Sequence, residues 1–364
     1  MAGPFLRCDG LAWRGEAHLT AASQGMLYIL PAPCMHVVRL VIASGESEEV
    51  DLPRGARATH AMFVDPHAGI SLLLATRDGE NIYVHRSRSR VLGKLKGVVI
   101  TAMGWLRPEG GRADGPREVV IGSSAGVIYE AVIEPQRTRL LKQLMVLSPP
   151  RPIHGLQAEP MQQGAGNQDG LLIMATTATR YYEFVGASSL ESLFAEYRGA
   201  TPLGHVEVGG AGGDAPHSGA LHCFRRPNGV ASAFGWLTLE GVYTGSLVFG
   251  SQGPRDAVAY DFQLLPYPAA AARRDHVAGT SLEHLAADGP QHPGGGGADG
   301  ASEAPLSLAL TEFHVVILYP SCVAAVSRLN GKLVCVARVP SGHLTSMAHD
   351  GTRGALWVSS PRGV

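Results

Sequence analysis

The feature that most constrains the fold is a unit that recurs along the whole chain. A short apolar run meets a turn of glycine or small polar residues and is followed by a second apolar run, often with an aromatic residue. In one copy, Leu72–Thr76 and Asn81–His85 flank the turn residues 77–80. Further copies are centred on residues 21–30, 119–131, 171–185, 233–244, 313–326 and 354–359. The length, composition and flanking turns of these runs are typical of β-strands.

The spacing of the copies favours a β-propeller. Most copies lie roughly 40 to 60 residues apart, which is the range of propeller blades. Solid apolar runs such as Leu72–Ala75 and Leu171–Ala175 indicate strands covered on both faces, and we interpret these two runs as innermost strands. About seven copies of about 45 residues fit the chain length. We therefore predict an all-β, seven-bladed β-propeller of four-stranded antiparallel blades, with the last blade a candidate for being incomplete.

The predicted propeller covers residues 17–364 after a lead-in at 1–16, and two segments interrupt it. In Ser189–Tyr197 the apolar residues recur with helical spacing, and Ser189 is a candidate N-cap, so we expect a short helix inserted between blades four and five. Residues 267–304 are rich in alanine and glycine and include three histidines. Such a segment buries too little apolar surface to offset its ordering entropy, which predicts a disordered loop.

Composition narrows the functional classes. The formal net charge is −1, so a surface-wide attraction to nucleic acid is not expected. The five cysteines form no C-x-x-C pair, which argues against a zinc site or a thioredoxin-type redox pair. The first residues lack the pattern of a secretory signal, and no apolar run approaches the ~20 residues that a membrane-spanning helix needs. These observations predict a cytoplasmic, reduced protein without metal or cofactor.

One pattern resembles a catalytic motif. Residues Gly122–Gly126 fit G-x-S-x-G, with Ser124 as the would-be nucleophile. That motif requires a helix after the turn, whereas Val127–Ile133 has the pattern of a second strand. We interpret the segment as a hairpin turn. Because no other catalytic, cofactor-binding or metal-binding constellation is evident, we predict that the protein is not an enzyme.

A cluster of basic residues has two interpretations. Arg86, Arg88 and Arg90 would project from one face of a strand, with Lys94 and Lys96 nearby. They could form a ridge that contacts phosphoinositide headgroups or another anionic surface. We prefer the plainer interpretation, a solvated outer strand whose charges prevent edge-to-edge pairing.

The order of the segments resembles the N-terminal β-propeller region of the vacuolar protein sorting-associated protein 18 (deep-orange) family. The resemblance rests on colinear segments, none of them specific alone: 62–65, 84–86, 95–97, 103–105, 121–131, 173–177, 182–186, 193–197, 233–236, 241–243, 310–314 and 354–358. It implies a seven-bladed propeller heading a long α-solenoid with a C-terminal RING-type zinc domain. This chain contains neither the solenoid nor a Cys/His zinc framework.

The resemblance implies a function in membrane tethering. Members of the family are core subunits of the HOPS and CORVET complexes, which bridge endosomal and vacuolar or lysosomal membranes, act with Rab GTPases through other subunits, and chaperone SNARE assembly. We therefore expect a non-catalytic interaction module with peripheral localisation on late endosomes and the vacuole or lysosome. The alternatives are a propeller scaffold of another coat-like assembly and a propeller enzyme with a site in its central channel.

Overall fold

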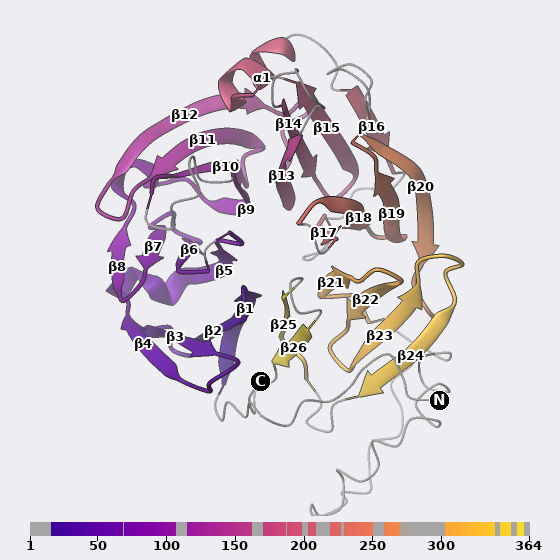
Figure 1. Cartoon of the computed structure of the whole chain (residues 1–364), viewed down its shortest axis with the longest axis horizontal. Helices are drawn as coiled ribbons and strands as arrows, with labels where there is room; N and C mark the ends of the chain where they lie inside the picture. Colours follow the sequence, from indigo (N-terminus) through magenta and orange to yellow (C-terminus); the bar gives the residue numbers. More distant parts are fainter. Residues whose placement is uncertain are drawn as a thin grey trace, which may run out of the picture.

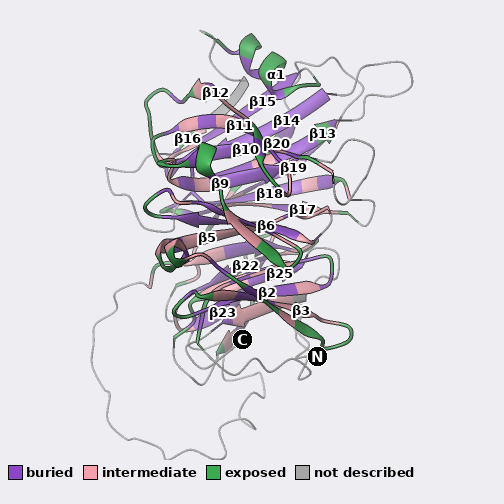
Figure 2. Cartoon of the chain, turned by 90° about the vertical axis from the view of Figure 1, so that its left-hand side faces the viewer, coloured by how far each residue is buried: buried purple, intermediate pink, exposed green. Residues whose placement is uncertain are grey.

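The computed structural model describes residues 16–67, 69–106, 115–161, 170–186, 188–198, 203–208, 219–226, 229–249, 258–269, 273, 303–338, 343–350 and 355–359. These residues form six four-stranded antiparallel sheets and one two-stranded sheet. The sheets are arranged as blades around a central axis (Figure 1). Seen at 90° to this view, buried strands are stacked across the disc and many of the exposed residues lie in turns and at strand ends (Figure 2).

The bounds of the elements follow the chain from blade to blade. Blade 1 contains β1 (Ala17–Ser23), β2 (Met26–Pro31), β3 (His36–Val41) and β4 (Ser47–Asp51). Blade 2 contains β5 (Thr59–Val64), β6 (Ser71–Thr76), β7 (Ile82–His85) and β8 (Arg88–Val91). Blade 3 contains β9 (Ile100–Trp105), β10 (Arg117–Ser123), β11 (Val127–Ile133) and β12 (Thr138–Val146). Blade 4 contains β13 (Gly155–Met161), β14 (Gly170–Thr176), β15 (Arg180–Gly186) and β16 (Leu203–Glu207).

Blade 5 contains β17 (Leu221–Arg225), β18 (Ala231–Leu237), β19 (Gly241–Leu247) and β20 (Ala259–Pro266). Blade 6 contains β21 (Ser307–Leu310), β22 (His314–Leu318), β23 (Cys322–Ser327) and β24 (Leu333–Arg338). The remaining sheet is the hairpin of β25 (Ser346–Asp350) and β26 (Ala355–Ser359). Three short helices complete the description: the 3-10 helices η1 (Arg54–Ala58) and η2 (Gly93–Leu95), and the α-helix α1 (Leu190–Glu196).

The prediction of seven four-stranded blades is wrong, because the structure has six. The sequence pattern at residues 354–359 corresponds to a strand, β26. In the described part of the chain, this strand pairs with β25 alone. The hairpin occupies the sector between blade 6 and blade 1, since β25 contacts both β21 and β1. Within the described residues, a two-stranded hairpin thus fills this sector.

The core of the disc lies between blades. Seven apolar clusters each join two neighbouring sheets, including one between the hairpin and blade 1 and one between the hairpin and blade 6. The second strand of a blade is therefore covered on both faces, and every residue of β6 and of β14 is buried. This packing explains the solid apolar runs of the sequence. It also corrects our interpretation of those runs: they are second strands, and the innermost strands are β1, β5, β9, β13, β17, β21 and β25 (Figure 1).

Two local predictions are confirmed. Residues 123–126 form the turn between β10 and β11, and Gly126 there has a φ of 74°, which suits glycine. The helix α1 begins after Ser189, whose hydroxyl accepts a hydrogen bond from the backbone N–H of Ser192. However, α1 lies inside blade 4, between β15 and β16, and not between blades four and five as we predicted. Most of the lead-in at 1–16 and of the predicted loop at 267–304 lies outside the described residues.

Candidate functional site

The structure distributes the basic cluster over a hairpin and a 3-10 helix of blade 2. His85 of β7 pairs with Arg88 of β8, so Arg86 lies in the two-residue turn between them, with a φ of 51°. Arg88 and Arg90 lie in the outer strand β8, whereas Lys94 is in η2 and Lys96 follows it. The single strand that we expected to carry all three arginines is therefore a turn and a strand.

The members of this cluster differ in exposure. Arg86, Arg88, Lys94 and Lys96 are exposed. Arg90 is half-buried, because its guanidinium donates hydrogen bonds to the carbonyl oxygens of Pro135 (3.0 Å) and Glu134 (2.7 Å) in blade 3. It also lies over the ring of Tyr83, 5.4 Å from the centroid. Arg90 therefore fastens blade 2 to blade 3, which leaves four exposed cations on this edge of the disc.

The innermost strands carry a repeated polar position that the sequence analysis missed. The second residue of β1, β5 and β9 is in each case polar and hydrogen-bonds a main-chain carbonyl of the next blade. The bonds are His18 Nε2 to Thr59 O (2.9 Å), His60 Nε2 to Ile100 O (2.9 Å) and Thr101 Oγ1 to Ile153 O (2.6 Å). Alignment of these second positions in the three strands is the signal that could have found them.

A histidine pair continues this polar inner lining. Nδ1 of His222 on β17 accepts a hydrogen bond from the backbone N–H of Leu310 (3.2 Å), and its Nε2 lies 3.1 Å from Nδ1 of His349 on β25. Desolvation lowers the pKa of both imidazoles, and for His222 the neighbouring His349 lowers it further. Neutral imidazoles fit this arrangement, since one ring must accept while the other donates.

A recess of about 260 Å³ lies among the innermost strands of blades 2 to 5. It is lined by Met62, Phe63, Val64, Pro66, Met103, Trp105, Gln157, Ala158 and Arg225. Most of the lining residues are apolar, with two methionine and two large aromatic side chains, but polar atoms make up more than half of the surface that the recess exposes. Such a recess can accommodate an apolar side chain of a partner.

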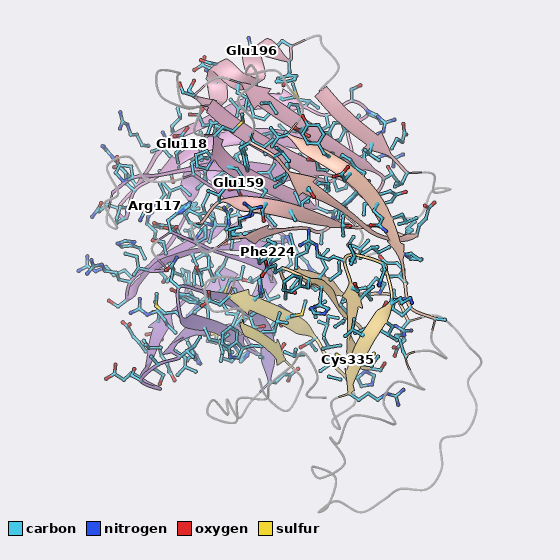
Figure 3. The ribbon with its side chains drawn as sticks, turned by 45° about the vertical axis from the view of Figure 1, so that its right-hand side comes forward. Arg117, Glu118, Glu159, Glu196, Phe224 and Cys335 are labelled. Atoms are coloured by element: carbon cyan, nitrogen blue, oxygen red, sulfur yellow. The ribbon has the colours of Figure 1, made fainter. Side chains whose placement is uncertain are left out.

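The charged group at this recess is neutralised within the protein. Arg225 forms a two-pronged ion pair with Glu159 of β13 and donates to the carbonyl of Gly229 (3.3 Å). Burial opposes the charge of Arg225, but the carboxylate of Glu159 raises the pKa of the guanidinium above its ordinary value. Glu159 and Phe224 are marked on strands near the axis in Figure 3. The pair joins blade 4 to blade 5.

Within the described ranges, no three His, Cys, Asp or Glu side chains are grouped so as to hold a metal ion. The four cysteines in those ranges are free thiols in buried positions. None of the helices that the structure describes has the length and apolarity to cross a bilayer. Among the described residues, the recess at blades 2 to 5 and the exposed cations of blade 2 are two surface features that a partner could contact.

Comparison with known proteins identifies the family. The family model of the Pep3/Vps18/deep orange β-propeller domain matches residues 18–364. The vacuolar sorting protein 18 of Arabidopsis thaliana is 28% identical over 310 residues, which are 82% of this chain and 28% of that protein. The vacuolar protein sorting-associated protein 18 homolog of Danio rerio is 24% identical over 336 residues, 84% of this chain and 29% of that protein. This chain spans less than a third of either relative. Because the family model matches this chain from the first blade to the last residue, the chain belongs to the Pep3/Vps18/deep orange β-propeller family.

Proposed function

We propose that this chain is a non-catalytic interaction module of a vacuolar sorting protein that acts as a core subunit of a membrane-tethering complex of the HOPS or CORVET kind. The observation that carries the proposal is the family match over residues 18–364. The relatives are named for vacuolar sorting and are more than three times as long as the matched segment. The propeller would therefore be one part of a larger subunit, and its partners would be other core subunits, with Rab GTPases and SNAREs reached through the complex.

The architecture supports a binding role. Interblade apolar clusters and hydrogen bonds from side chains to main-chain carbonyls hold the blades in a fixed arrangement, so little conformational freedom is left to lose when a partner binds. A rigid disc presents two faces and a rim, and distinct partners can occupy them together.

The exposed cations of blade 2 give this module a way to meet a membrane. Arg86, Arg88, Lys94 and Lys96 lie close together in the sequence and on one edge of the disc. Each basic residue near an anionic leaflet contributes about 1 kcal/mol of attraction. A peripheral location on late endosomal and vacuolar or lysosomal membranes is part of this proposal, and contact of these cations with an anionic leaflet would support it.

Affinity purification of the tagged endogenous protein tests the tethering proposal. The expected result is recovery of several other large tethering subunits and cofractionation with late endosomal or vacuolar membranes. Recovery of the protein alone, wholly in the soluble fraction, would contradict the proposal.

Liposome flotation tests the membrane contact separately. The double variant Arg88→Glu, Lys96→Glu should float with phosphoinositide-containing vesicles about thirty-fold less than the wild type, because losing two cations at ~1 kcal/mol each weakens the attraction by about 2 kcal/mol. The matched control reverses two exposed charges of blade 6, Lys332→Glu and Arg338→Glu. Equal loss in both double variants would show that only net charge matters and that blade 2 has no special role.

A further inference from the structure

One end of the disc gathers the connections between blades. Because each blade is an antiparallel meander, the turn between its second and third strands lies at the same end as the link to the next blade. From blade 1 to the start of blade 4, these turns and links alternate around the ring. They are the turns 32–35, 77–81 and 124–126 and the links 52–58, 92–99 and 147–154, all within the described ranges. We refer to the surface that these six segments form as the link face.

Main-chain hydrogen bonds join each of the six segments to the next one around the ring. Each bond runs from a backbone N–H of one segment to a carbonyl oxygen of its neighbour. The donor and acceptor pairs are Leu52 to Met35 (2.9 Å), Arg77 to Ala58 (2.9 Å), Gly97 to Gly79 (3.2 Å), Ser124 to Val99 (3.0 Å) and Leu147 to Gly126 (2.9 Å). The side chains of the link face are therefore carried by a fixed backbone, so ordering of the backbone adds little to the cost of binding a partner.

The link face is strongly basic, although the whole chain has a formal net charge of −1. Its segments contain two carboxylates, of which Asp78 is exposed and Glu80 is half-buried. The six cations of these segments, all exposed, are Arg54, Arg57, Arg77, Lys94, Lys96 and Arg151. None of them forms an ion pair with another described residue. Six cations without an ion-pair partner, against two carboxylates, make this surface complementary to an acidic ligand.

The composition of the link face favours a protein ligand over a lipid leaflet. Four of the six cations are arginines, and Met35, which is 40% exposed, has its sulfur 3.8 Å from Nη2 of Arg57. Arginine and methionine are enriched in protein–protein interfaces, whereas lysine is depleted. An arginine can also hold a carboxylate with two parallel hydrogen bonds. Asp78, which follows Arg77 in the turn, would be repelled by an anionic leaflet but can accept a hydrogen bond from a protein chain.

We propose that the link face binds an acidic segment of a partner protein. Carboxylates of this segment would pair with Arg54, Arg57 and Arg77, and an apolar side chain of the segment would pack on Met35. The three arginines are neighbours, since the backbone N–H of Arg77 bonds to the carbonyl oxygen of Ala58, the last residue of η1. The proposal rests on the interaction role proposed above, of which it names one surface and the chemistry of its ligand.

The link face and the membrane contact proposed above differ in their place on the disc. Arg86 and Arg88 lie at the opposite end of β8, at the turn between the third and fourth strands of blade 2. Only Lys94 and Lys96, in the link that follows β8, belong to both sets. The part of the link face formed by η1 and Arg77 is therefore separate from the cations assigned to the membrane.

Fluorescence anisotropy tests the proposal with a defined probe, a labelled peptide in which runs of Asp and Glu flank a central Leu-Phe pair. The double variant Arg57→Glu, Arg77→Glu should bind this peptide at least ten-fold more weakly than the wild type, which corresponds to about 1.4 kcal/mol for two exposed ion pairs. The matched control, Arg88→Glu with Arg226→Glu, makes the same change of net charge at exposed positions on the opposite end of the disc and should bind as the wild type does. Equal weakening in both double variants would overturn the proposal, because only net charge would then matter.

Two further measurements separate the proposal from its alternatives. A photo-crosslinking residue in place of Met35 in the tagged endogenous protein should link to a partner segment rich in Asp and Glu, and links only to lipid, or only to neutral or basic segments, would contradict the proposal. If Arg57→Glu, Arg77→Glu loses flotation with phosphatidylserine-containing vesicles but keeps its affinity for the peptide, the link face contacts the membrane and the proposal is wrong. Failure to recover tethering subunits by affinity purification would count against the tethering role alone, because the peptide measurement does not depend on it.

Discussion

The carboxyl group of Glu183 offers a sharp test of how neighbouring blades are held together. Glu183 of β15 is 1% exposed, and it accepts hydrogen bonds from the backbone N–H groups of Val258 and Ala259 at the start of β20 in blade 5. Desolvation raises its pKa from 4.5 to about 7, although those N–H donors act in the opposite direction. The group is therefore held near the point of ionisation at neutral pH.

The sign of the pH effect follows from the direction of the shift. Between pH 4.5 and about 7 the folded state binds the Glu183 proton more tightly than the unfolded chain does. The stability contributed by this group is therefore fully present at low pH and is lost as the pH rises through that window. A shift from 4.5 to about 7 corresponds to about 3 kcal/mol lost by pH 8.

The substitution Glu183→Gln removes the charge and keeps an oxygen that can accept from Val258 and Ala259. We expect the free energy of unfolding of Glu183→Gln, relative to the wild type, to rise by about 2.5 kcal/mol between pH 5 and pH 8. Glu183→Ala should lose about 1–3 kcal/mol relative to the Gln variant at every pH, because two buried N–H groups lose their acceptor.

Urea denaturation at pH 5, 6, 7 and 8 gives the required free energies. Comparing the variant with the wild type at each pH cancels the other titrating groups of the protein. Glu49→Gln, at an exposed position of β4, is the matched control and should show no pH-dependent difference. A Glu183→Gln variant that is destabilised by the same amount at all four pH values would refute the argument from desolvation.

Three further predictions concern other parts of the disc. The ion pair of Arg117 with Asp65 (2.7 Å) is buried, with side-chain exposures of 1% and 0%, so Arg117→Met should lower the free energy of unfolding by about 3–5 kcal/mol. Adding Asp65→Asn should recover part of this loss. If it recovers nothing, the unpaired carboxylate is not the cause of the loss. In thermal unfolding, Gly126→Ala should destabilise the protein more than Gly45→Ala does. Both glycines have φ near +74°, but only a Cβ at position 126 would lie 2.7 Å from the backbone N of Arg151. Equal losses of stability would mean that the strain in φ accounts for the whole effect. The fold lowers the pKa of His222, so the stability that this imidazole contributes is lost as the pH falls below 6.5, the ordinary pKa of histidine. His222→Gln should therefore flatten the decline in stability between pH 6.5 and 4. An unchanged slope would exclude this imidazole as the source of the decline.

Turns and second strands were predictable because their causes are local. A run covered on both faces is uniformly apolar wherever it lies, as in β6 and β14. A turn such as Ser123–Gly126 requires small residues and a glycine at positive φ. Likewise the cap of α1 depends on Ser189 and the residues directly after it. These signals correctly gave the class of fold, the recurrence of the blades and the short helix.

The innermost strands and the candidate sites could not be read in this way, because their side chains have partners in other blades. His60 looks like any strand histidine until the carbonyl of Ile100 is placed against it. Arg90 has the same local pattern as Arg88, yet one is fastened to Pro135 and the other is exposed.

By itself, the sequence determined the β-propeller class, the places where its strands turn and the family to which it is similar. Only the tertiary structure decided which strands face the axis, which of the five basic residues are exposed, and that the described residues form six four-stranded blades and one hairpin. The physical reason is that strand formation depends on alternation and turns over a few residues. The number of strands in a blade depends instead on which segment, near or far in the chain, pairs with each edge.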